Sequence, residues 1–505
     1  MWRNPLADPP LPDPAPQADV CLIAEGCYPY VSGGVSNWID WLIRSQPDLT
    51  FSVLAILPGI PTTEPRYQRP PNLRAIDHLY LDGSVETSSG SWPRISPTDM
   101  SELMGGILQQ GEPAEFERLI RILRESKRPS LDAMLNSPQG WQSMCDYYRH
   151  LPHASFLGYF WAWRTLVGGL LRVLNFKLRP ARLYHAVSTG YAGLLGARAS
   201  VETGMPSLIT EHGIYSNERR IEILMADWIA NSIDNGLDLS DSRTDIREFW
   251  ATAFDSFARI SYAAATELTP HNAANQSFQR ILGAADEKRL VIPNGVDVAR
   301  FSELAPVEHE EPTIAFIGRV TPIKDVQTFL DVADILRKQF PTLRALVIGP
   351  MDEDPDYAEA CINEAQSRGL DSVVTFTGPA DVRAHLARID VLVLTSISEA
   401  QPLVVLEAGA ASVPCVTTDV GACREMLEGA LGGHDQPPGG IVVPVGASEE
   451  MAAMIGTLLA DPDLRRSYGC SLHERVTTHY RAEVIADSYR ALYTRTLASQ
   501  HEGVS

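Results

Sequence analysis

The chain has 505 residues, 45% hydrophobic and 21% charged, a length and composition that suit a folded globular protein of two domains. The formal net charge of −21 argues against nucleic acid or an anionic membrane as the main partner, because both favour basic surfaces. The seven cysteines are scattered and form no CxxC pair, which predicts reduced thiols in a cytoplasmic protein and no zinc ribbon.

Two segments of the first half bear on targeting. Met1–Ala18 is rich in Pro, Asp and Ala and lacks a basic start followed by an apolar run, which predicts a disordered lead-in and not a signal peptide. Phe156–Leu174 is the most apolar long stretch, but Arg164 and Arg172 interrupt it. A half-buried helix is therefore favoured over a membrane span, and a helix docking on a membrane surface or a partner is the alternative.

Short β-branched runs alternate with helical patterns along residues 19–293, which is typical of a parallel sheet covered by helices. Helices are expected over Ser36–Arg44 and Ile246–Ala263. Residues from about 85 to 178 break this alternation with a polar segment and then an aromatic-rich helical stretch, which predicts a helical insertion. The expected strands are Asp19–Ala24, Phe51–Leu57, Leu183–Ser188, Ser207–Thr210, Thr266–Leu268 and Leu290–Ile292.

The second half shows the same alternation more clearly. Residues 294–312 combine turn chemistry with proline and acidic residues, which indicates a linker before a second domain over 313–480. Residues 481–505 are expected to form a final helix that could cross back to the first domain. The expected strands are Thr313–Ile317, Arg344–Ile348, Val373–Phe376, Val391–Leu394, Cys415–Thr417 and Ile441–Val443.

The predicted fold is α/β, with two facing Rossmann-like domains, parallel sheets and a helical insertion in the first domain. Ligands of such sheets bind beyond the carboxyl ends of the strands, where helix N-termini offer free N–H groups. The active site is therefore expected in the cleft where these ends of the two domains meet.

Two carboxylates follow the expected strand Val391–Leu394. Glu399 lies in the loop, and Glu407 lies about one turn into the helix that starts near Leu403. A carboxylate directed from a helix into a cleft suits vicinal hydroxyls, because its two acceptor oxygens match two O–H donors. The amides around Gln401 and Leu403 favour a phosphate, and the alternative is an ordinary strand, loop and helix.

Two cations follow the first strand of the second domain. Arg319 and Lys324 are five residues apart across a turn, so both could converge on one diphosphate, the arginine as a fork and the lysine as a point charge. Two solvated surface cations are the alternative.

The first domain contributes glycines and a histidine. Gly33 and Gly34 follow the first strand and allow close backbone approach to a ligand, although they form no GxGxxG motif. His212 ends the strand Ser207–Thr210 and is placed to touch a sugar or a developing charge. A tight turn and a structural histidine are the respective alternatives.

No metal site is predicted. Asp352-Glu353-Asp354 matches the DxD pattern that binds a metal ion in some enzymes, but it lies in a proline-containing loop. We interpret it as a solvated acidic segment. His150 and His153 lack companions and are interpreted as structural.

Taken together, these motifs resemble family 4 retaining glycosyltransferases of the GT-B fold. The resemblance runs over most of the chain and rests on Glu399-x7-Glu407, Gly318-Arg319 with Lys324, Asn294-Gly295-Val296-Asp297 and Gly33-Gly34. The stretches Asp19–Ile39, Tyr184–Tyr191, Thr210–Arg219 and Thr395–Leu406 are similar to the Pel-type exopolysaccharide subgroup. That resemblance implies a UDP-sugar donor, usually UDP-glucose, a glycan acceptor and inner-membrane Pel proteins as partners.

The resemblance also implies residue roles. Glu407 would bind ribose hydroxyls, Glu399 the donor hexose, and Arg319 with Lys324 the diphosphate. The remaining positions would line the site: the amides of Gln401 and Leu403 at the distal phosphate, Gly33 and Gly34 opposite them, His212 at the reacting centre, Phe376 beside the base, and Asn294 with its motif. The chain departs from the family pattern at Ala400-Gln401-Pro402 and at Ser412, where glycines are usual.

The implied reaction is front-face transfer without a cofactor or metal, because the cations stabilise the leaving UDP. Two other functions fit the same pattern. A UDP-sugar epimerase shares the architecture, and a catalytically weak scaffold of a membrane polysaccharide synthase would keep the fold without the chemistry.

Overall fold

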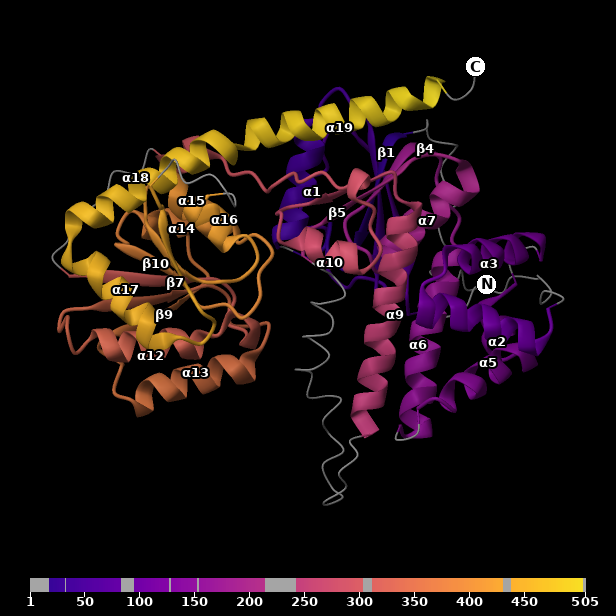
Figure 1. Ribbon diagram of the computed structural model, residues 1–505, viewed down its shortest axis with the longest axis horizontal. Helices are drawn as coiled ribbons and strands as arrows, with labels where there is room; N and C mark the ends of the chain where they lie inside the picture. Colours follow the sequence, from indigo (N-terminus) through magenta and orange to yellow (C-terminus); the bar gives the residue numbers. More distant parts are fainter. Residues whose placement is uncertain are drawn as a thin grey trace, which may run out of the picture.

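The computed structural model describes residues 18–31, 33–82, 95–126, 129–151, 154–213, 242–302, 311–429 and 437–502. The expected lead-in except Ala18, which begins the first strand, and part of the expected linker therefore lie outside the described residues, as does His153. Two sheets, each covered by helices, form two domains side by side (Figure 1).

The first sheet has six parallel strands in the order β3-β2-β1-β4-β5-β6. Val20 on the central strand pairs with Phe51 on one side and Leu183 on the other, and all three are buried. The strands are β1 (Ala18–Glu25), β2 (Phe51–Leu57), β3 (Leu73–Tyr80), β4 (Ala181–Ala186), β5 (Ser207–Glu211) and β6 (Glu267–Pro270).

The second sheet repeats this arrangement in the order β12-β11-β10-β7-β8-β9. Both orders reverse beside the first strand, between β1 and β4 and between β7 and β10, and ligands of open parallel sheets bind at this switch point. The strands are β7 (Thr313–Ile317), β8 (Arg344–Ile348), β9 (Val374–Gly378), β10 (Val391–Leu394), β11 (Cys415–Thr418) and β12 (Gly440–Val443).

Helices cover both faces of each sheet, because the strands are buried on both sides. Around the first sheet these are α1 (Gly34–Ser45), α7 (Tyr191–Thr203), α9 (Ser242–Ala264) and α10 (Asn275–Ile281). Around the second they are α11 (Val298–Ser302), α12 (Val326–Leu336), α13 (Pro355–Ser367), α14 (Val382–Leu386), α15 (Leu403–Ala410), α16 (Cys423–Glu428), α17 (Ser448–Ala460) and α18 (Pro462–His479). Short 3-10 turns span Asp286–Lys288 and Pro322–Lys324.

Between β3 and β4 the chain forms a helical layer beside the first sheet (Figure 1). Its helices are α2 (Pro97–Gly105), which continues as a π-helix over Gly106–Gln110, then α3 (Pro113–Glu125), α4 (Leu131–Leu135), α5 (Pro138–Tyr148) and α6 (Phe156–Asn175). The buried side chains of this layer share one core cluster with α7 and α9. Among the described residues, no helix is both long and apolar enough to cross a membrane.

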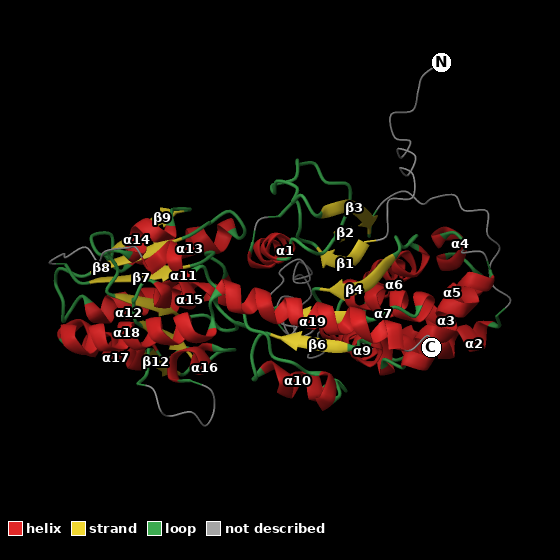
Figure 2. Ribbon diagram, turned by 90° about the horizontal axis from the view of Figure 1, so that it is seen from above, coloured by secondary structure: helices red, strands yellow, loops and turns green. Residues whose placement is uncertain are grey.

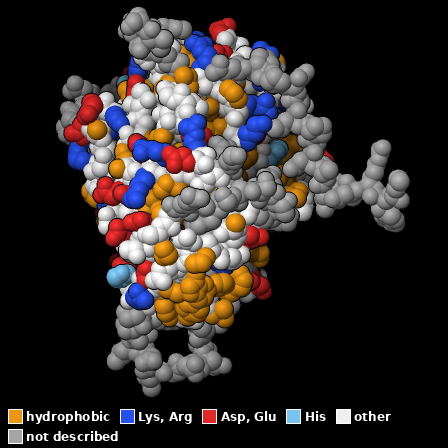
Figure 3. Space-filling view, turned by 90° about the vertical axis from the view of Figure 1, so that its right-hand side faces the viewer, with side chains coloured by type: hydrophobic (Ala, Val, Ile, Leu, Met, Phe, Trp, Pro, Cys, Tyr) orange, Lys and Arg blue, Asp and Glu red, His pale blue; other side chains and the backbone are white. Residues whose placement is uncertain are grey.

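The start of α6 is exposed, although most of the helix is buried. Leu157 and Trp161 are 65% and 60% exposed, and Trp141 of α5 is 51% exposed. Figure 3 shows hydrophobic side chains gathered at the lower end of this side of the molecule.

The last helix, α19 (Ala482–Glu502), runs from the second domain across the first (Figures 1 and 2). Tyr489 and Tyr493 are buried in the same core cluster as strands β1 and β2. Gln46 Nε2 at the end of α1 donates to Ala486 O at 2.7 Å. The core of the first domain therefore includes side chains from α19.

Two differences from the sequence prediction have physical causes. Leu290–Ile292 was expected as a strand, but it forms only two hydrogen bonds to β6, next to an isolated bridge between Arg289 and Leu268, so that prediction was wrong. Strand β3 was missed because it lies at the sheet edge and carries Arg74, Asp77 and His78 in place of a continuous apolar run.

Candidate active site

A largely buried ion pair at the predicted site joins two loops of the second domain. Lys324 Nζ, at the end of the turn after β7, lies 2.5 Å from Glu399 Oε1, in the loop after β10. Ser396 Oγ donates to the same oxygen at 2.7 Å. The side chains of Lys324 and Glu399 are only 18% and 11% exposed, so the pair is better shielded from solvent than a surface salt bridge.

Hydrogen bonds hold these two loops against each other. Thr395 Oγ1 donates to Lys324 O at 3.0 Å, and Ile397 N donates to Ile323 O at 2.9 Å. On the other side, Thr418 Oγ1 donates to Ser396 O at 2.6 Å. The loops are thus fixed before any ligand binds, which favours electrostatic stabilisation of a bound charge.

Glu407 lies deeper, in the second turn of α15. Burial raises the pKa of Glu407 to about 7, because desolvation disfavours the carboxylate, while the positive charge of Arg300 on α11 acts in the opposite direction. A carboxyl group with this pKa is poised between its neutral and charged forms near neutral pH, and it accepts hydroxyl donors best when it is charged.

Arg319 does not converge with Lys324 in this structure. It forms an ion pair with Glu353 of the loop after β8, and both side chains are about half exposed (51% and 50%). The two cations therefore bind different carboxylates here. An exposed pair of this kind is weak, so little free energy opposes its exchange for a ligand phosphate.

Two buried polar groups near this loop lack hydrogen-bond partners among the described residues. They are Gln401 Nε2 and Thr321 Oγ1, and both residues are only 6% exposed. The other end of the Gln401 amide is occupied, since Oε1 accepts from Asn294 N at 2.6 Å. A buried donor without an acceptor is costly, so these groups indicate where a ligand or water completes the site.

The loop that carries Gln401 also meets the first domain. Asn272 Nδ2 donates to Ala400 O at 2.9 Å. A Cβ placed on Gly34, the first residue of α1, would lie 3.9 Å from Leu403 Cδ1, so these two predicted site residues come together across the domains. Gly33 precedes them in an extended conformation, with φ 168°.

His212 lies at the end of β5 in a chain of hydrogen bonds. His271 Nδ1 is 2.8 Å from Ile292 O, so this nitrogen carries the proton. His271 Nε2 is then an acceptor, 3.0 Å from His212 Nδ1, which donates. His212 Nε2 is left as a buried acceptor with no partner among the described residues.

Both histidines are neutral at physiological pH. Burial lowers the pKa of His271 to about 4, and burial together with the neighbouring histidines lowers the pKa of His212 well below its usual value. Trp38 lies edge-on to His212, with ring centroids 4.6 Å apart. His212 Nε2 can therefore accept a hydrogen bond from a hydroxyl group, but the low pKa opposes transfer of the proton to this nitrogen.

Phe376 and the acidic segment Asp352-Glu353-Asp354 have contacts that are typical of a folded domain. Phe376 lies on the edge strand β9 and packs partly buried against the second-domain core. Asp354 caps α13 by accepting from Tyr357 N, and Glu353 binds Arg319. In the portion of the chain that the structure describes, no group of three or more His, Cys, Asp or Glu residues could hold a metal.

Sequence reasoning missed His271 and Asn272, which follow β6. Their position at the carboxyl end of a strand was visible in the sequence Thr269-Pro270-His271-Asn272. The contacts to His212 and Ala400 could not be seen, because they join segments 59 and 128 residues apart.

Comparison with known proteins assigns a family. Residues 18–287, more than half of the chain, match the model described as "Domain of unknown function (DUF3492)". The chain belongs to this family. In this DUF3492 protein, residues 311–461 also match the model described as "Glycosyl transferases group 1", which covers most of the second domain.

Several curated relatives are glycosyltransferases. A D-inositol 3-phosphate glycosyltransferase of Kineococcus radiotolerans is 30% identical over 39% of this chain and 49% of its own length. An alpha-maltose-1-phosphate synthase of Mycolicibacterium smegmatis is 24% identical over 66% of this chain and 84% of its own length. The chain thus spans about half the length of the first relative. These matches are consistent with the predicted enzyme class, a glycosyltransferase.

Solved structures share the fold over nearly the whole chain. Sucrose-phosphate synthase from Thermosynechococcus elongatus has a TM-score of 0.58 at 15% identity, covering 95% of this chain and 100% of that one. Anabaena Alr3699/HepE, solved in complex with UDP, has a TM-score of 0.56 at 14% identity, covering 94% and 99%. These likenesses confirm the predicted GT-B class of two Rossmann-like domains.

Proposed function

We propose that this protein transfers a hexose from a UDP-sugar, with UDP-glucose as the first donor to test, onto a growing bacterial exopolysaccharide, with retention of anomeric configuration. The observation that carries the proposal is the fixed Lys324–Glu399 pair next to two donors, Gln401 Nε2 and Thr321 Oγ1, that have no partner among the residues that the structure describes. A cation and free donors at the end of a parallel sheet suit a nucleotide diphosphate.

The donor would lie along the second domain. Glu407 would accept the ribose hydroxyls, and Lys324 with Arg319 would neutralise the diphosphate once Arg319 leaves Glu353. Glu399 would hold hexose hydroxyls, and the free amides at the start of α15 would meet the distal phosphate. Phe376 would flank the base in this arrangement.

In the transfer step, the bond between the anomeric carbon and the UDP oxygen breaks, and the acceptor oxygen bonds to that carbon on the same face. The departing phosphate takes the acceptor proton, so the chain needs no separate base. Lys324 and Arg319 would stabilise the negative charge that develops on UDP, and this would make a metal ion unnecessary. His212 would line the reacting centre as a neutral acceptor.

Resemblance to PelF, the cytosolic glycosyltransferase of Pel exopolysaccharide synthesis, supports the acceptor and the location. In this proposal the protein works in the cytoplasm together with inner-membrane Pel proteins. The exposed apolar residues Trp141, Leu157 and Trp161 would suit recruitment to such an assembly.

The test is incubation of the purified protein with UDP-glucose and, in parallel, UDP-N-acetylglucosamine, GDP-mannose and ADP-glucose, with and without EDTA. UDP release with UDP-glucose that persists in EDTA is expected, and Arg319→Ala should lower it. NMR of the sugar separates the epimerase alternative, because an isomerised donor with no transfer would contradict the proposal. A protein that UDP does not stabilise thermally would fit the scaffold alternative.

A further inference from the structure

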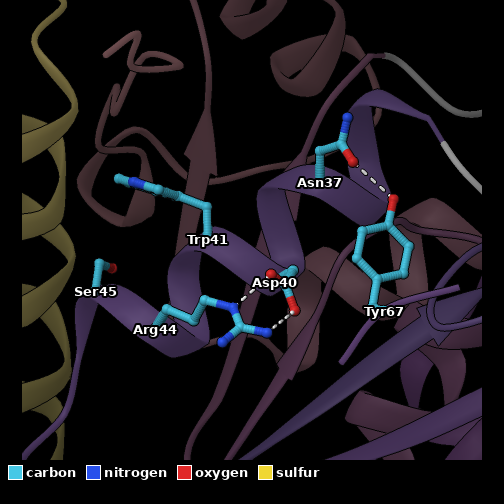
Figure 4. A pocket seen from close by; sticks show the side chains of 6 residues that line it. All are labelled: Asn37, Asp40, Trp41, Arg44, Ser45 and Tyr67. Carbon is cyan, nitrogen blue, oxygen red and sulfur yellow. Dashed lines mark hydrogen bonds and ion pairs between the residues drawn. The ribbon is translucent and has the colours of Figure 1, made fainter. Parts of the chain in front are cut away.

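An open depression of about 450 Å³ runs along the outer face of α1. Its lining consists of Asn37, Asp40, Trp41, Arg44 and Ser45 from the helix and Tyr67 from the segment between β2 and β3. Figure 4 shows Trp41 directed to one side and Tyr67 standing on the other, with Asp40 and Arg44 between them. We call this depression the α1 groove.

The α1 groove combines two aromatic rings with planar polar groups. Aromatic rings offer flat apolar faces, and carboxylate, amide and guanidinium groups offer pairs of acceptors or donors at fixed spacing. A pyranose ring presents the same combination, with apolar C–H faces and a rim of paired hydroxyls. The lining therefore matches a carbohydrate better than a purely apolar or purely charged ligand.

Internal hydrogen bonds fix these side chains before binding. Arg44 Nε donates to Asp40 Oδ2 at 2.7 Å, and the guanidinium also donates to Gln68 O at 2.5 Å. Tyr67 Oη donates to Asn37 Oδ1 at 2.7 Å. Side chains already held in one rotamer lose less conformational entropy when a ligand binds.

The charge of the α1 groove is balanced. Arg44 is the one cation in the lining and is paired with Asp40, the one anion. A phosphorylated or acidic glycan would need an excess of cations, so the lining favours a neutral glycan.

The α1 groove begins close to the proposed site of transfer. Asn37 lies one turn after Gly34, the residue that faces Leu403 of the second domain. From Gly34 to Arg44 the helix rises about 15 Å, enough for a few linked pyranose rings. A chain lying in the groove would thus have one end near the interdomain loop.

We propose that the α1 groove binds a neutral linear glycan, the part of the acceptor that has already been polymerised. This proposal rests on the proposed transferase function. Binding at a distance from the transfer site would keep the acceptor attached between additions.

The test is binding of maltohexaose, cellohexaose and chitohexaose to the full chain, measured by calorimetry, with UDP titrated separately. Saturable binding of at least one hexasaccharide is expected, and Trp41→Ala should weaken it about tenfold, the loss of one aromatic contact. Trp41→Phe, which keeps a ring, should recover part of the affinity, and Asn37→Ala, at an exposed position, should weaken binding without risk to the fold.

Trp141→Ala is the matched control, because Trp141 is 51% exposed and lies on α5, outside the groove. The α1 groove proposal would be overturned if no hexasaccharide bound, or if Trp41→Ala and Asn37→Ala both bound a hexasaccharide as tightly as the natural chain. UDP binding without glycan binding would leave the donor proposal standing, whereas glycan binding without UDP binding would contradict the transferase and not the groove.

Discussion

His271 fixes which nitrogen of His212 carries a proton. The hydrogen bond from His271 Nδ1 to Ile292 O leaves Nε2 free to accept from His212 Nδ1. His271 thus acts as a positioning residue, and His212 presents an acceptor at Nε2 toward its unpartnered side. Second partners of this kind hold a side chain in its tautomer and orientation.

We predict that His271→Leu lowers kcat about tenfold or more, because an unheld imidazole loses its tautomer and orientation. The acid limb of the pH profile should also move to higher pH, since the pKa of His212 rises when the second imidazole is removed. His271→Gln retains an acceptor and should recover part of kcat. Unchanged pH profiles in both variants would contradict this role.

The raised pKa of Glu407 leads to a prediction about how the stability of the protein depends on pH. Its pKa is about 7 in the folded protein and lower in the unfolded chain, so the unfolded chain loses its proton first as pH rises. The free energy of unfolding therefore falls between about pH 4.5 and 7. Glu407→Gln should stabilise the ligand-free protein by up to about 3 kcal/mol at pH 8 and by little at pH 4.5.

Thermal and urea unfolding at the two pH values would measure this difference. Glu483→Gln serves as the control, because Glu483 is largely exposed and should show no pH-dependent gain. An equal gain at both pH values would show that Glu407 does not titrate in this window.

At the residue scale, sequence reasoning found the groups but not all of their partners. Glu399 and Lys324 were expected at one ligand, and the structure joins them directly. Arg319 was expected beside them but binds Glu353, because a long exposed side chain takes the nearest carboxylate when no ligand is present. The spacing of a motif shows which residues follow a strand. It does not show which partner each side chain contacts, because the side-chain rotamers depend on neighbours from other strands.

At the scale of the elements, helix α19 contributes to the stability of the first domain through a buried hydrogen bond. Tyr493 Oη lies 2.8 Å from His185 Nδ1, and both residues are buried in the first domain. Burial lowers the pKa of His185 to about 3, so the imidazole stays neutral and needs partners for both nitrogens. Thr210 Oγ1 supplies the second, at 2.7 Å from Nε2.

Tyr493→Phe should therefore reduce the free energy of unfolding by about 1–3 kcal/mol, the cost of one unpaired buried nitrogen. Urea denaturation gives the value. Tyr468→Phe is the control, since Tyr468 is only partly buried on α18 and should lose much less. Equal losses would mean that the hydrogen bond between helix and strand contributes nothing specific.

Strands were predictable where they are buried on both faces, because their apolar runs stand out in the sequence. Phe51–Leu57 and Thr313–Ile317 were expected with their observed bounds. Elements at the sheet edges were not predictable in this way. Strand β3 is only partly buried and mixes charged with apolar residues, and Leu290–Ile292 is apolar but forms only two hydrogen bonds to β6. An apolar run in the sequence indicates that a segment is buried. Whether that segment pairs with a strand depends on how the chain passes the edge of the sheet.

At the scale of the whole molecule, the loop carrying Gln401 connects the domains. Gln401 Oε1 accepts from Asn294 N, and Ala400 O accepts from Asn272 Nδ2. The proposed donor would share this loop, so domain position and donor binding should be coupled.

Gln401→Ala should weaken UDP binding about tenfold or more, because it removes a buried donor together with the hydrogen bond to Asn294 at the start of the linker. Calorimetric titration with UDP measures the affinity, and small-angle scattering reports whether the domains separate. Asn272→Ala should separate the domains with a smaller loss of UDP affinity. The coupling is excluded if Gln401→Ala binds UDP as tightly as the natural chain.

The sequence predicted two Rossmann-like halves and their order, because each half repeats the same alternation of strand and helix. It could not predict how the halves face each other. That arrangement includes single hydrogen bonds such as the one from Asn272 to Ala400, and no periodic sequence pattern predicts such contacts.

The path of α19 has a consequence for synthesis of the protein. A ribosome finishes the strands of the first domain hundreds of residues before it makes Tyr489 and Tyr493, which close the core around β1 and β2. During that interval an apolar surface beside Val20 and Leu22 stands open to water. The nascent first domain can therefore bury this surface only after α19 has been synthesised.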